Sequence, residues 1–509
     1  MELELERELQ KHFRFSTFRT GQKEIIQDVL NGNDVLGILP TGSGKSICYQ
    51  LPAIMMDGLT IVVSPLISLM MDQVKEMKAN HFKKVIAINS FMNFEERREI
   101  YRNIHTYKLL FISPELLSQD FIIHLLQRVK VSLFVIDEAH CISQWGYEFR
   151  PDYLKLNSII EKLGNPPTLA LSGTATPEVQ ADIMTSLNKP EMIKHIYPMD
   201  KPNIAFCIEE VENDQEKNDM IIQLLKKYNI PTLIYFSSRL TAESFTRFLS
   251  EKLQGRRVGF YHAGMEPMDR VMIQQQFMNN QLDIVCCTSA FGMGINKGNI
   301  RLIIHYHIPL QLESFIQEVG RAGRDGKSSV SLLLFSKSDM LLPNHLIKSE
   351  LPDAKDLSNV FGYLRDLTLQ DMDLPKDDVQ IQNLFNLNET QWRFLRYQLE
   401  KHHLIHDNKI MDYNKTWEDI YQSIFHVINS RVKLKISKLT EIIKWIHEDR
   451  CLRDTLYQGF QPTHSGAEFQ CCSNCGFTWS EWTPEQQEIE SNLGLNWENK
   501  LKKLLLLDI

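Results

Sequence analysis

Short hydrophobic segments alternate with longer amphipathic ones from about residue 20 to residue 340 of this chain. The short segments are rich in Val, Ile and Leu, which is typical of β-strands buried on both faces. In the first half they are DVLGIL (34–39), TIVVS (60–64), KVIAIN (84–89), KLLFIS (108–113), SLFVID (132–137) and TLALS (168–172). In the second half they are TLIYFS (232–237), VGFYH (258–262), DIVCC (283–287), LIIHYH (302–307) and SLLLF (331–335).

Continuous hydrophobic strands between helices predict a parallel sheet with helices on both faces, which is an α/β fold. The two series of strands are separated near residues 199–203, so we expect two α/β lobes with a cleft between them. We place the first lobe at residues 1–200 and the second at 201–345. Ligands of such sheets bind at the carboxyl ends of the strands, and chemical motifs are expected there.

The pattern becomes helical after residue 340. Residues 377–405 predict a short helix, a break at Leu387, and a longer helix that Asn388 would cap. A small hairpin at 406–413 would complete a helix-turn-helix with a wing, although a plain helical spacer explains the same pattern. Another helix is expected at 431–450. We therefore divide the rest of the chain into a helical, winged-helix-like insert (346–425), a helix with a Cys-rich module (426–480) and an amphipathic helical tail (481–509).

Composition indicates a soluble globular protein with several domains, since 43% of the 509 residues are hydrophobic and 24% are charged. No run of eighteen apolar residues is present, and the acidic N-terminal segment MELELERELQKHF differs from a signal peptide. We therefore expect a cytoplasmic protein. Because the net charge is −8, any nucleic acid must be held by local basic strips.

A glycine-rich loop follows the strand at 34–39 and precedes a helical segment. Its glycines allow backbone N–H groups to surround phosphates, and the helix N-terminus adds a positive dipole end. Lys45 would reach the β and γ phosphates of ATP, and Ser46 would ligate Mg²⁺. A chance glycine-rich turn is the alternative. The candidate phosphate-binding residues are Thr41, Gly42, Ser43, Gly44, Lys45 and Ser46.

An acidic pair, Asp137 and Glu138, ends the strand SLFVID. An Asp there can hold the Mg²⁺ water shell, and the next Glu can orient or deprotonate an attacking water. Such a pair is often only a helix cap, but together with the phosphate loop it indicates nucleotide hydrolysis.

Two arginines, Arg321 and Arg324, are spaced to share one face of a helix in the second lobe. Arginine stabilises phosphate charge well because its fork binds two oxygens. Two solvated surface arginines are the alternative, but the flanking glycines permit close approach to a ligand.

The ordered set of motifs resembles the superfamily 2 helicases and, among them, the RecQ family. The matching segments of the first half are FRFSTFRTGQ (13–22), VVSPLISLMMDQV (62–74), DEAHCISQWGYEFRPDY (137–153) and LSGTATP (171–177). Those of the second half are IYFSSR (234–239), YHAGM (261–265), TSAFGMGINKGNIR (288–301) and QEVGRAGRDG (317–326). The resemblance covers residues 10–340, and it is strongest to the short bacterial RecQ-like helicases that lack the C-terminal winged-helix and HRDC domains.

This resemblance implies roles for individual residues. Phe15 would stack on adenine, Gln22 would bind the edge of the base, and Arg19 would lie nearby. Ser64 falls in the motif that grips the tracked strand, and Thr174 in the motif that couples DNA to ATP. His140 would connect the γ-phosphate region with a DNA-sensing aromatic loop. The DNA contacts of that loop would be Trp145, Phe149 and Arg150, and the second-lobe motif would contribute Gln317, Arg321 and Arg324 to catalysis.

RecQ proteins also carry a zinc module, which has one cysteine on a long helix and three on a loop. The resemblance implies the same role for Cys451, Cys471, Cys472 and Cys475, and four thiolates suit tetrahedral zinc. The spacing departs from the family, since Thr478 stands near the place of the last expected cysteine. The fourth ligand could therefore be Cys472, His464 or water, and free thiols are the alternative.

We therefore expect a DNA-stimulated ATPase that translocates on single-stranded DNA and unwinds duplexes in recombination or repair. The 3′→5′ direction and an association with the bacterial nucleoid are implied by the resemblance alone. The expected cofactors are ATP, Mg²⁺ and Zn²⁺, and the expected partners are single-stranded and forked DNA with single-stranded-DNA-binding or repair proteins. An RNA helicase and an ATP-gated DNA-binding protein without unwinding activity are the rival hypotheses. Since the family's strand-separating domain does not fit after Cys475, the insert at 355–415 could replace it.

Overall fold

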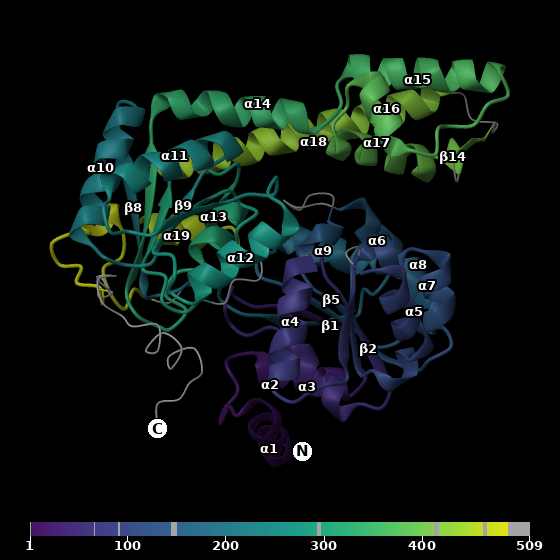
Figure 1. The fold of residues 1–509 in the computed structure, drawn as a ribbon, viewed down its shortest axis with the longest axis horizontal. Helices are drawn as coiled ribbons and strands as arrows, with labels where there is room; N and C mark the ends of the chain where they lie inside the picture. Colours follow the sequence, from purple (N-terminus) through teal and green to yellow (C-terminus); the bar gives the residue numbers. More distant parts are fainter. Residues whose placement is uncertain are drawn as a thin grey trace. The chain divides into compact units, whose positions relative to one another are not determined.

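The computed structural model describes residues 2–65, 67–89, 92–143, 150–292, 297–406, 408–411, 417–461 and 466–486. The chain forms two compact units (Figure 1). The first unit contains residues 1–202, 308–320 and 338–466. The second contains residues 203–307, 321–337 and the described residues from Ala467 onward.

The first unit contains a parallel sheet of seven strands in the order β3-β4-β2-β5-β6-β1-β7. Six of these strands match the predicted segments, and the edge strand β7 was not predicted. The strands are β1 (Val35–Ile38), β2 (Leu59–Val63), β3 (Val85–Ile88), β4 (Leu109–Ile112), β5 (Val131–Ile136), β6 (Thr168–Ser172) and β7 (Ile193–Ile196).

Alternate residues of these strands enter separate hydrophobic cores, because successive side chains of a strand point to opposite faces. Ile61 and Val63 pack with the helices between residues 94 and 186, whereas Val62 packs with those between residues 22 and 79. Both faces are therefore covered, as predicted, and we call this sheet with its helices the first lobe. The helices are α1 (Glu2–Phe13), α2 (Gln22–Leu30), α3 (Ile47–Met55), α4 (Ile67–Ala79), α5 (Phe94–Arg102), α6 (Pro114–Leu117), α7 (Asp120–Leu126), α8 (Leu156–Lys162) and α9 (Pro177–Ser186), with short 3₁₀ turns η1 (Ile104–Thr106), η2 (Ala139–Ile142) and η3 (Pro151–Lys155).

The second unit contains a parallel sheet of six strands in the order β10-β11-β9-β12-β13-β8, which we call the second lobe with its helices. Five strands were predicted, and β8 pairs along the free edge of β13. Trp482 from the C-terminal segment joins the core beneath α10 and α11. The elements are β8 (Ile204–Glu210), β9 (Thr232–Tyr235), β10 (Val258–Tyr261), β11 (Ile284–Cys287), β12 (Leu302–His305), β13 (Ser329–Phe335), α10 (Asp214–Lys227), α11 (Arg239–Lys252), α12 (Pro267–Met278) and η5 (Ser473–Cys475).

The remaining elements of the first unit are mainly helical. They are α13 (Leu312–Val319), η4 (Lys337–Met340), α14 (Leu341–Glu350), α15 (Ala354–Leu369), α16 (Asp378–Phe385), α17 (Glu389–Lys401), β14 (Ile405–His406), β15 (Lys409–Ile410), α18 (Trp417–Ile446) and α19 (Leu452–Tyr457). Asn388 caps α17 with a reciprocal capping box, as predicted. The predicted hairpin is present as the antiparallel pair β14–β15.

One helix, α18, connects two hydrophobic regions of the first unit. Its 30 residues span about 45 Å at 1.5 Å per residue. Ile420, Ile424 and Ile428 pack in a core with α15, α16 and α17, whereas the ring of Trp445 packs at a tilt against Phe315 of α13. Figure 1 shows α14 alongside the later part of α18, and the two helices are in contact. The helix begins well before the predicted residue 431, so the insert and the segment toward Cys451 share one rigid element.

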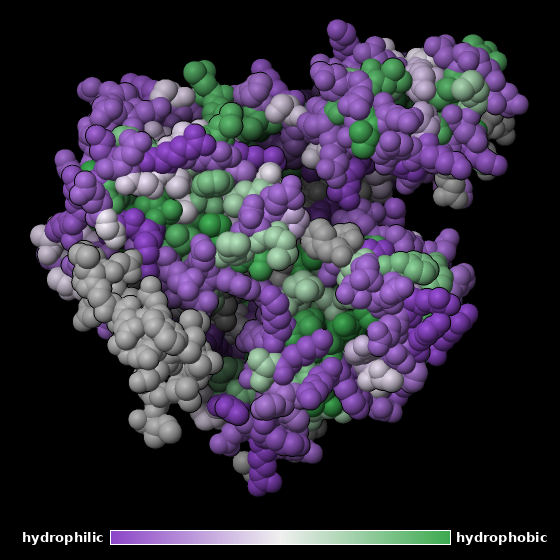
Figure 2. Space-filling model, in the orientation of Figure 1, coloured by the Kyte–Doolittle hydropathy of each residue, from purple (hydrophilic) through white to green (hydrophobic). Residues whose placement is uncertain are grey.

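Among the described helices, none combines the length and the apolar character needed to span a bilayer. Figure 2 shows a mainly hydrophilic face, with apolar side chains gathered over α14, where Leu341 is exposed.

Candidate active site

The phosphate loop joins β1 to the N-terminus of α3, as the sequence predicted. Gly42 and Gly44 have φ angles of 84° and 77°, which only glycine adopts without strain. Ser46 stands immediately before the first turn of α3. Within the described residues, the Ser43 Oγ is buried and has no hydrogen-bond partner. A phosphate oxygen would satisfy this hydroxyl, so the loop fits a nucleotide.

The side chains of Gln22 and Arg19 donate hydrogen bonds to backbone carbonyls of the phosphate loop. The Gln22 Nε2 donates to the carbonyl oxygens of Ser43 and Gly44, both at 2.9 Å, and its Oε1 accepts from the Arg19 backbone N–H at 3.0 Å. Arg19 Nη1 donates to the Gly42 carbonyl at 2.7 Å. Phe15, by contrast, is 53% exposed, so its ring is available to stack on a base. In this structure Gln22 therefore orders the phosphate loop.

The acidic pair lies directly after β5. Glu138 has φ 49° and ψ 49°, a left-handed conformation that is uncommon for a residue with a side chain. Burial and, after it, the charge of Glu138 raise the pKa of Asp137 to about 7, and the nearby charge of Lys45 opposes both effects. A buried carboxylate pair beside one lysine needs additional positive charge, which a divalent cation at Asp137 and Ser46 would supply.

His140 joins the acidic pair to the end of β6. It is fully buried, and burial lowers its pKa to about 4, so the imidazole is neutral at pH 7. Its Nδ1 lies 2.9 Å from the Ser172 Oγ, and Ser172 donates to the carbonyl of Thr174 at 3.2 Å. These bonds are consistent with a proton on Nδ1. The segment Ser172–Thr174, which the resemblance assigned to coupling, is thus bonded directly to the residues that follow Glu138.

Lys45 lies at the centre of this arrangement. A Cβ added to Gly173 would lie 3.0 Å from the Lys45 Nζ, so a larger residue there would crowd this lysine. Gly173 was not among the site residues predicted from the sequence. The motif LSGTATP that contains it was the sequence feature that pointed to this segment. Tyr153 is a second site residue that was not predicted from the sequence. Its hydroxyl donates to the Asp137 carbonyl at 3.1 Å.

Helix α13 brings Gln317 and Gly320 into the first unit. Gln317 is buried, and Gly320 packs so tightly against Thr41 of the phosphate loop that no side chain would fit there. Lys201 Nζ donates to the Gly320 carbonyl at 2.5 Å. The start of the QEVGRAGRDG motif therefore contacts the phosphate loop.

The prediction that Arg321 and Arg324 share one face of a helix was wrong. Helix α13 ends at Val319, and both arginines lie in a turn in which Gly323 and Gly326 have φ angles of 53° and 81°. Arg321 is 2% exposed and donates through Nη1 to the Gly292 carbonyl. Within the described part of the chain, its Nε and Nη2 are buried without a hydrogen-bond partner. Unpaired buried donors cost about 1–3 kcal/mol each, and an anionic ligand would relieve that cost.

The aromatic loop can be placed only in part. Trp145 and Phe149 lie outside the described residues. Arg150 Nη1 is 3.7 Å from Glu115, which Arg393 of α17 also approaches at 3.5 Å. Ser64 is buried immediately after β2.

In the described part of the second unit, the sulfur atoms of Cys471, Cys472 and Cys475 lie within 4.8 Å of one another, so these three side chains could share a metal ion. Cys451 follows α18 in the first unit. In the second unit, Cys471 accepts from the backbone of Phe206 at 3.0 Å, which ties the segment to β8. Gly476, with φ 87°, turns the chain back after Cys475. His464 and the residues from 487 onward, including most of the predicted tail, lie outside the described residues.

Each of the two lobes matches a known protein family. Residues 19–183 match the family described as DEAD/DEAH box helicase, and residues 216–326 match the helicase conserved C-terminal domain. Solved structures show the same fold of two RecA-like lobes. The helicase Lhr of Mycobacterium smegmatis, bound to ssDNA and AMP-PNP, aligns with a TM-score of 0.56 and 22% identity over 68% of this chain and 49% of its own. The DEAD-box helicase Mss116, bound to ssRNA, aligns with a TM-score of 0.58 and 16% identity over 85% of this chain and 89% of its own.

Curated relatives narrow the assignment. The probable ATP-dependent DNA helicase RecS of Bacillus subtilis is 39% identical over 505 residues, which is 99% of this chain and 98% of that protein. The ATP-dependent DNA helicase RecQ of Haemophilus influenzae is 40% identical over 333 residues, covering 65% of this chain and 53% of that protein. The match to RecQ thus covers about two thirds of this chain, whereas the match to RecS covers nearly all of it. The chain belongs to the RecQ-like superfamily 2 ATP-dependent DNA helicases, in the short form that RecS represents.

Proposed function

We propose that ATP hydrolysis at the phosphate loop drives this helicase along single-stranded DNA. The observation that carries this proposal is the buried set around Lys45, in which Asp137, Glu138 and His140 connect to Ser172 and Thr174. A change in the nucleotide site can reach the coupling motif through His140 without crossing solvent.

In the proposed reaction, Lys45 and the loop N–H groups hold the β and γ phosphates. A Mg²⁺ ion held by Ser46 and Asp137 would neutralise charge on those phosphates. Glu138 orients a water and accepts its proton as the oxygen attacks the γ phosphorus. The bond from that phosphorus to the bridging oxygen breaks, and ADP leaves with the electron pair.

Arg321 is the proposed arginine finger. Its two unpartnered nitrogens, Nε and Nη2, have the geometry that binds two phosphate oxygens together. Arg324 would assist from the same turn. We infer that ATP draws this turn toward the phosphate loop, and that hydrolysis releases it, so that one ATP cycle produces one movement along the strand.

Direction and substrate can be tested with partial duplexes that carry either a 3′ or a 5′ single-stranded tail. We expect ATP-dependent strand separation from the 3′-tailed DNA and little from the 5′-tailed DNA. RNA versions of both substrates are expected to stimulate the ATPase only weakly. Strand separation from RNA alone would favour an RNA helicase, and DNA-stimulated ATP turnover without any separation would favour an ATP-gated binding protein.

We further propose that Cys451, Cys471, Cys472 and Cys475 bind one Zn²⁺ ion as thiolates. The chemistry of these side chains supports the proposal, since four cysteine thiolates satisfy the preference of zinc for four tetrahedral ligands. We expect about one zinc per chain by elemental analysis, and a chelator should lower the melting temperature. Cys475→Ser should reduce the zinc content, whereas Cys48→Ser, which alters a buried thiol of α3, should not. Metal-free protein with unchanged melting would contradict this proposal.

A further inference from the structure

Helix α13 is attached at its two ends to different parts of the first unit. At its start, a carboxylate oxygen of Glu313 lies 2.9 Å from the Lys438 Nζ of α18. Just beyond its end, Gly320 packs against Thr41 of the phosphate loop. The eight residues of α13 span only about 12 Å at 1.5 Å per residue. A shift of α18 against the start of α13 would therefore move the end that touches the phosphate loop.

The ion pair between α13 and α18 is largely shielded from water. The side chain of Glu313 is 9% exposed and that of Lys438 is 20% exposed. Burial lowers the pKa of Lys438, but the charge of Glu313 and a hydrogen bond to it leave that pKa above its usual value. Within the described residues, the Oε2 of Glu313 is buried and has no hydrogen-bond partner. Loss of Lys438 would therefore leave a buried carboxylate without its compensating charge.

The same pair lies on the helix face that carries a predicted catalytic residue. Glu313 and Gln317 are four residues apart on α13, so their side chains share one face of this helix. Both residues are buried. Gln317 belongs to the motif QEVGRAGRDG, to which the resemblance assigned a part in catalysis. The position of Gln317 against the phosphate loop thus depends on how both ends of α13 are held.

Glu313 also has a purely structural explanation. It lies in the first turn of α13, where a negative charge is favoured by the helix dipole. That interaction needs no partner from another element. Lys438, however, is supplied by α18, and about two turns later on α18 the ring of Trp445 packs against Phe315 of α13. The start of α18 packs in the core of the insert, so these contacts connect the insert with the motif helix.

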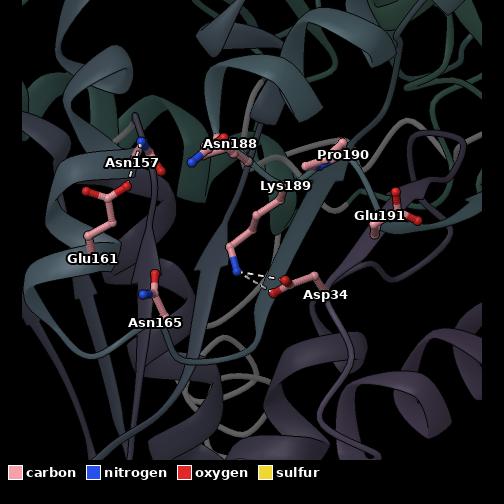
Figure 3. Close-up of a pocket in the computed structure, with 9 residues that line it drawn as sticks. Asp34, Asn157, Glu161, Asn165, Asn188, Lys189, Pro190 and Glu191 are labelled. Carbon is pink, nitrogen blue, oxygen red and sulfur yellow. Dashed lines mark hydrogen bonds and ion pairs between the residues drawn. The ribbon is translucent and has the colours of Figure 1, made fainter.

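Two other lysines of the first unit form ion pairs that do not involve α13. Lys435, about one turn earlier on α18, lies 2.5 Å from a carboxylate oxygen of Glu350 on α14. Lys189 lies 2.7 Å from Asp34 in a pocket of about 360 Å³ in the first lobe (Figure 3). The side chains of these two lysines are 19% and 12% exposed. Both pairs therefore serve as controls for the loss of a largely buried lysine as such.

We propose that Lys438 is a positioning residue for ATP hydrolysis, which holds α13 through Glu313 and so keeps Gln317 in place at the phosphate loop. The inference rests on the proposed function, because it gives Lys438 a part in the same reaction. A misplacement of about 1 Å at a reacting group can lower a rate about 10²-fold, so a small tilt of α13 has a measurable effect. Through α18, the insert gains a route by which it can alter ATP turnover.

The variant Lys438→Met tests the proposal by steady-state ATP turnover with saturating single-stranded DNA. We expect kcat to fall about tenfold or more, with a change of less than about threefold in KM for ATP, because Lys438 contacts α13 and not the nucleotide. Lys438→Arg keeps the cation and should retain most of the turnover. Lys435→Met and Lys189→Met should each keep kcat within about twofold of the unchanged protein, although their melting temperatures fall.

A double variant, Lys438→Met with Glu313→Gln, separates positioning from stability. It leaves no unpaired buried charge, so the melting temperature should recover, while kcat should stay low because α13 is still not tied to α18. Recovery of kcat together with the melting temperature would overturn the proposal. So would full turnover in Lys438→Met, or an equal loss in Lys435→Met. ATP turnover that survives Lys45→Ala would instead refute the proposed function, so the two failures are distinguishable.

Discussion

Replacement of Lys45 by alanine is expected to lower DNA-stimulated ATP turnover by about 10²- to 10³-fold or more. The charge of Lys45 acts on Asp137, and its Nζ lies beside Gly173 of the coupling motif. Without it, the phosphates lose their nearest fixed cation while the acidic pair remains. Steady-state phosphate release with saturating single-stranded DNA measures the effect.

DNA affinity should be largely retained in Lys45→Ala, since this lysine serves the nucleotide. Lys189→Ala is the matched control, because it removes a lysine of the same lobe that is paired with Asp34. Lys189→Ala should keep the ATP turnover of the unchanged protein when both are measured at a temperature at which both are folded. Normal ATP turnover in Lys45→Ala would exclude the phosphate loop as the catalytic site.

Arg321→Ala should reduce kcat by about 10³-fold or more, which is the range known for arginine fingers, with a much smaller change in KM for ATP. The guanidinium stabilises charge that develops in the transition state, so its loss affects turnover more than ground-state binding. Arg321→Lys should rescue little, because lysine lacks the planar fork.

Since Arg321 is buried, its variants need a stability control. Arg301 serves this purpose, because it is also buried in the second lobe but is fully engaged with Asp325. We expect Arg301→Lys to lower the melting temperature with little change in kcat. A proportional loss of stability and turnover in both variants would show that Arg321 acts only structurally.

The hydrophobic pattern predicted every interior strand and the edge strands β3 and β10, but it missed the edge strands β7 and β8. Interior strands such as β2 and β5 are buried on both faces and therefore read as continuous apolar runs. In β7, Lys194 and His195 stand between two isoleucines that are 37% and 44% exposed, so no such run exists. The apolar residues at the start of β8 lie next to the break between the two strand series. Because the strand ends in Glu209 and Glu210, its apolar run is short and was not recognised as a strand.

Local structure was predicted correctly where the local sequence determines it. The phosphate loop and the capping of α17 by Asn388 are of this kind. The arginine turn was misjudged because a spacing of three suggests a helix, while Gly320, Gly323 and Gly326 end it. The packing of Gly320 on Thr41 and of Gly173 beside Lys45 depends on the tertiary fold, and no local pattern predicts it.

We propose that a single ATP is bound by both Lys45 and Arg321. A crystal structure of the chain with Mg²⁺, a non-hydrolysable ATP analogue and single-stranded DNA tests this directly. We predict the Nε and Nη2 of Arg321 within about 3 Å of γ-phosphate oxygens that Lys45 also contacts. An ordered analogue bound by Lys45, with the Arg321 guanidinium directed away from it, would contradict the account.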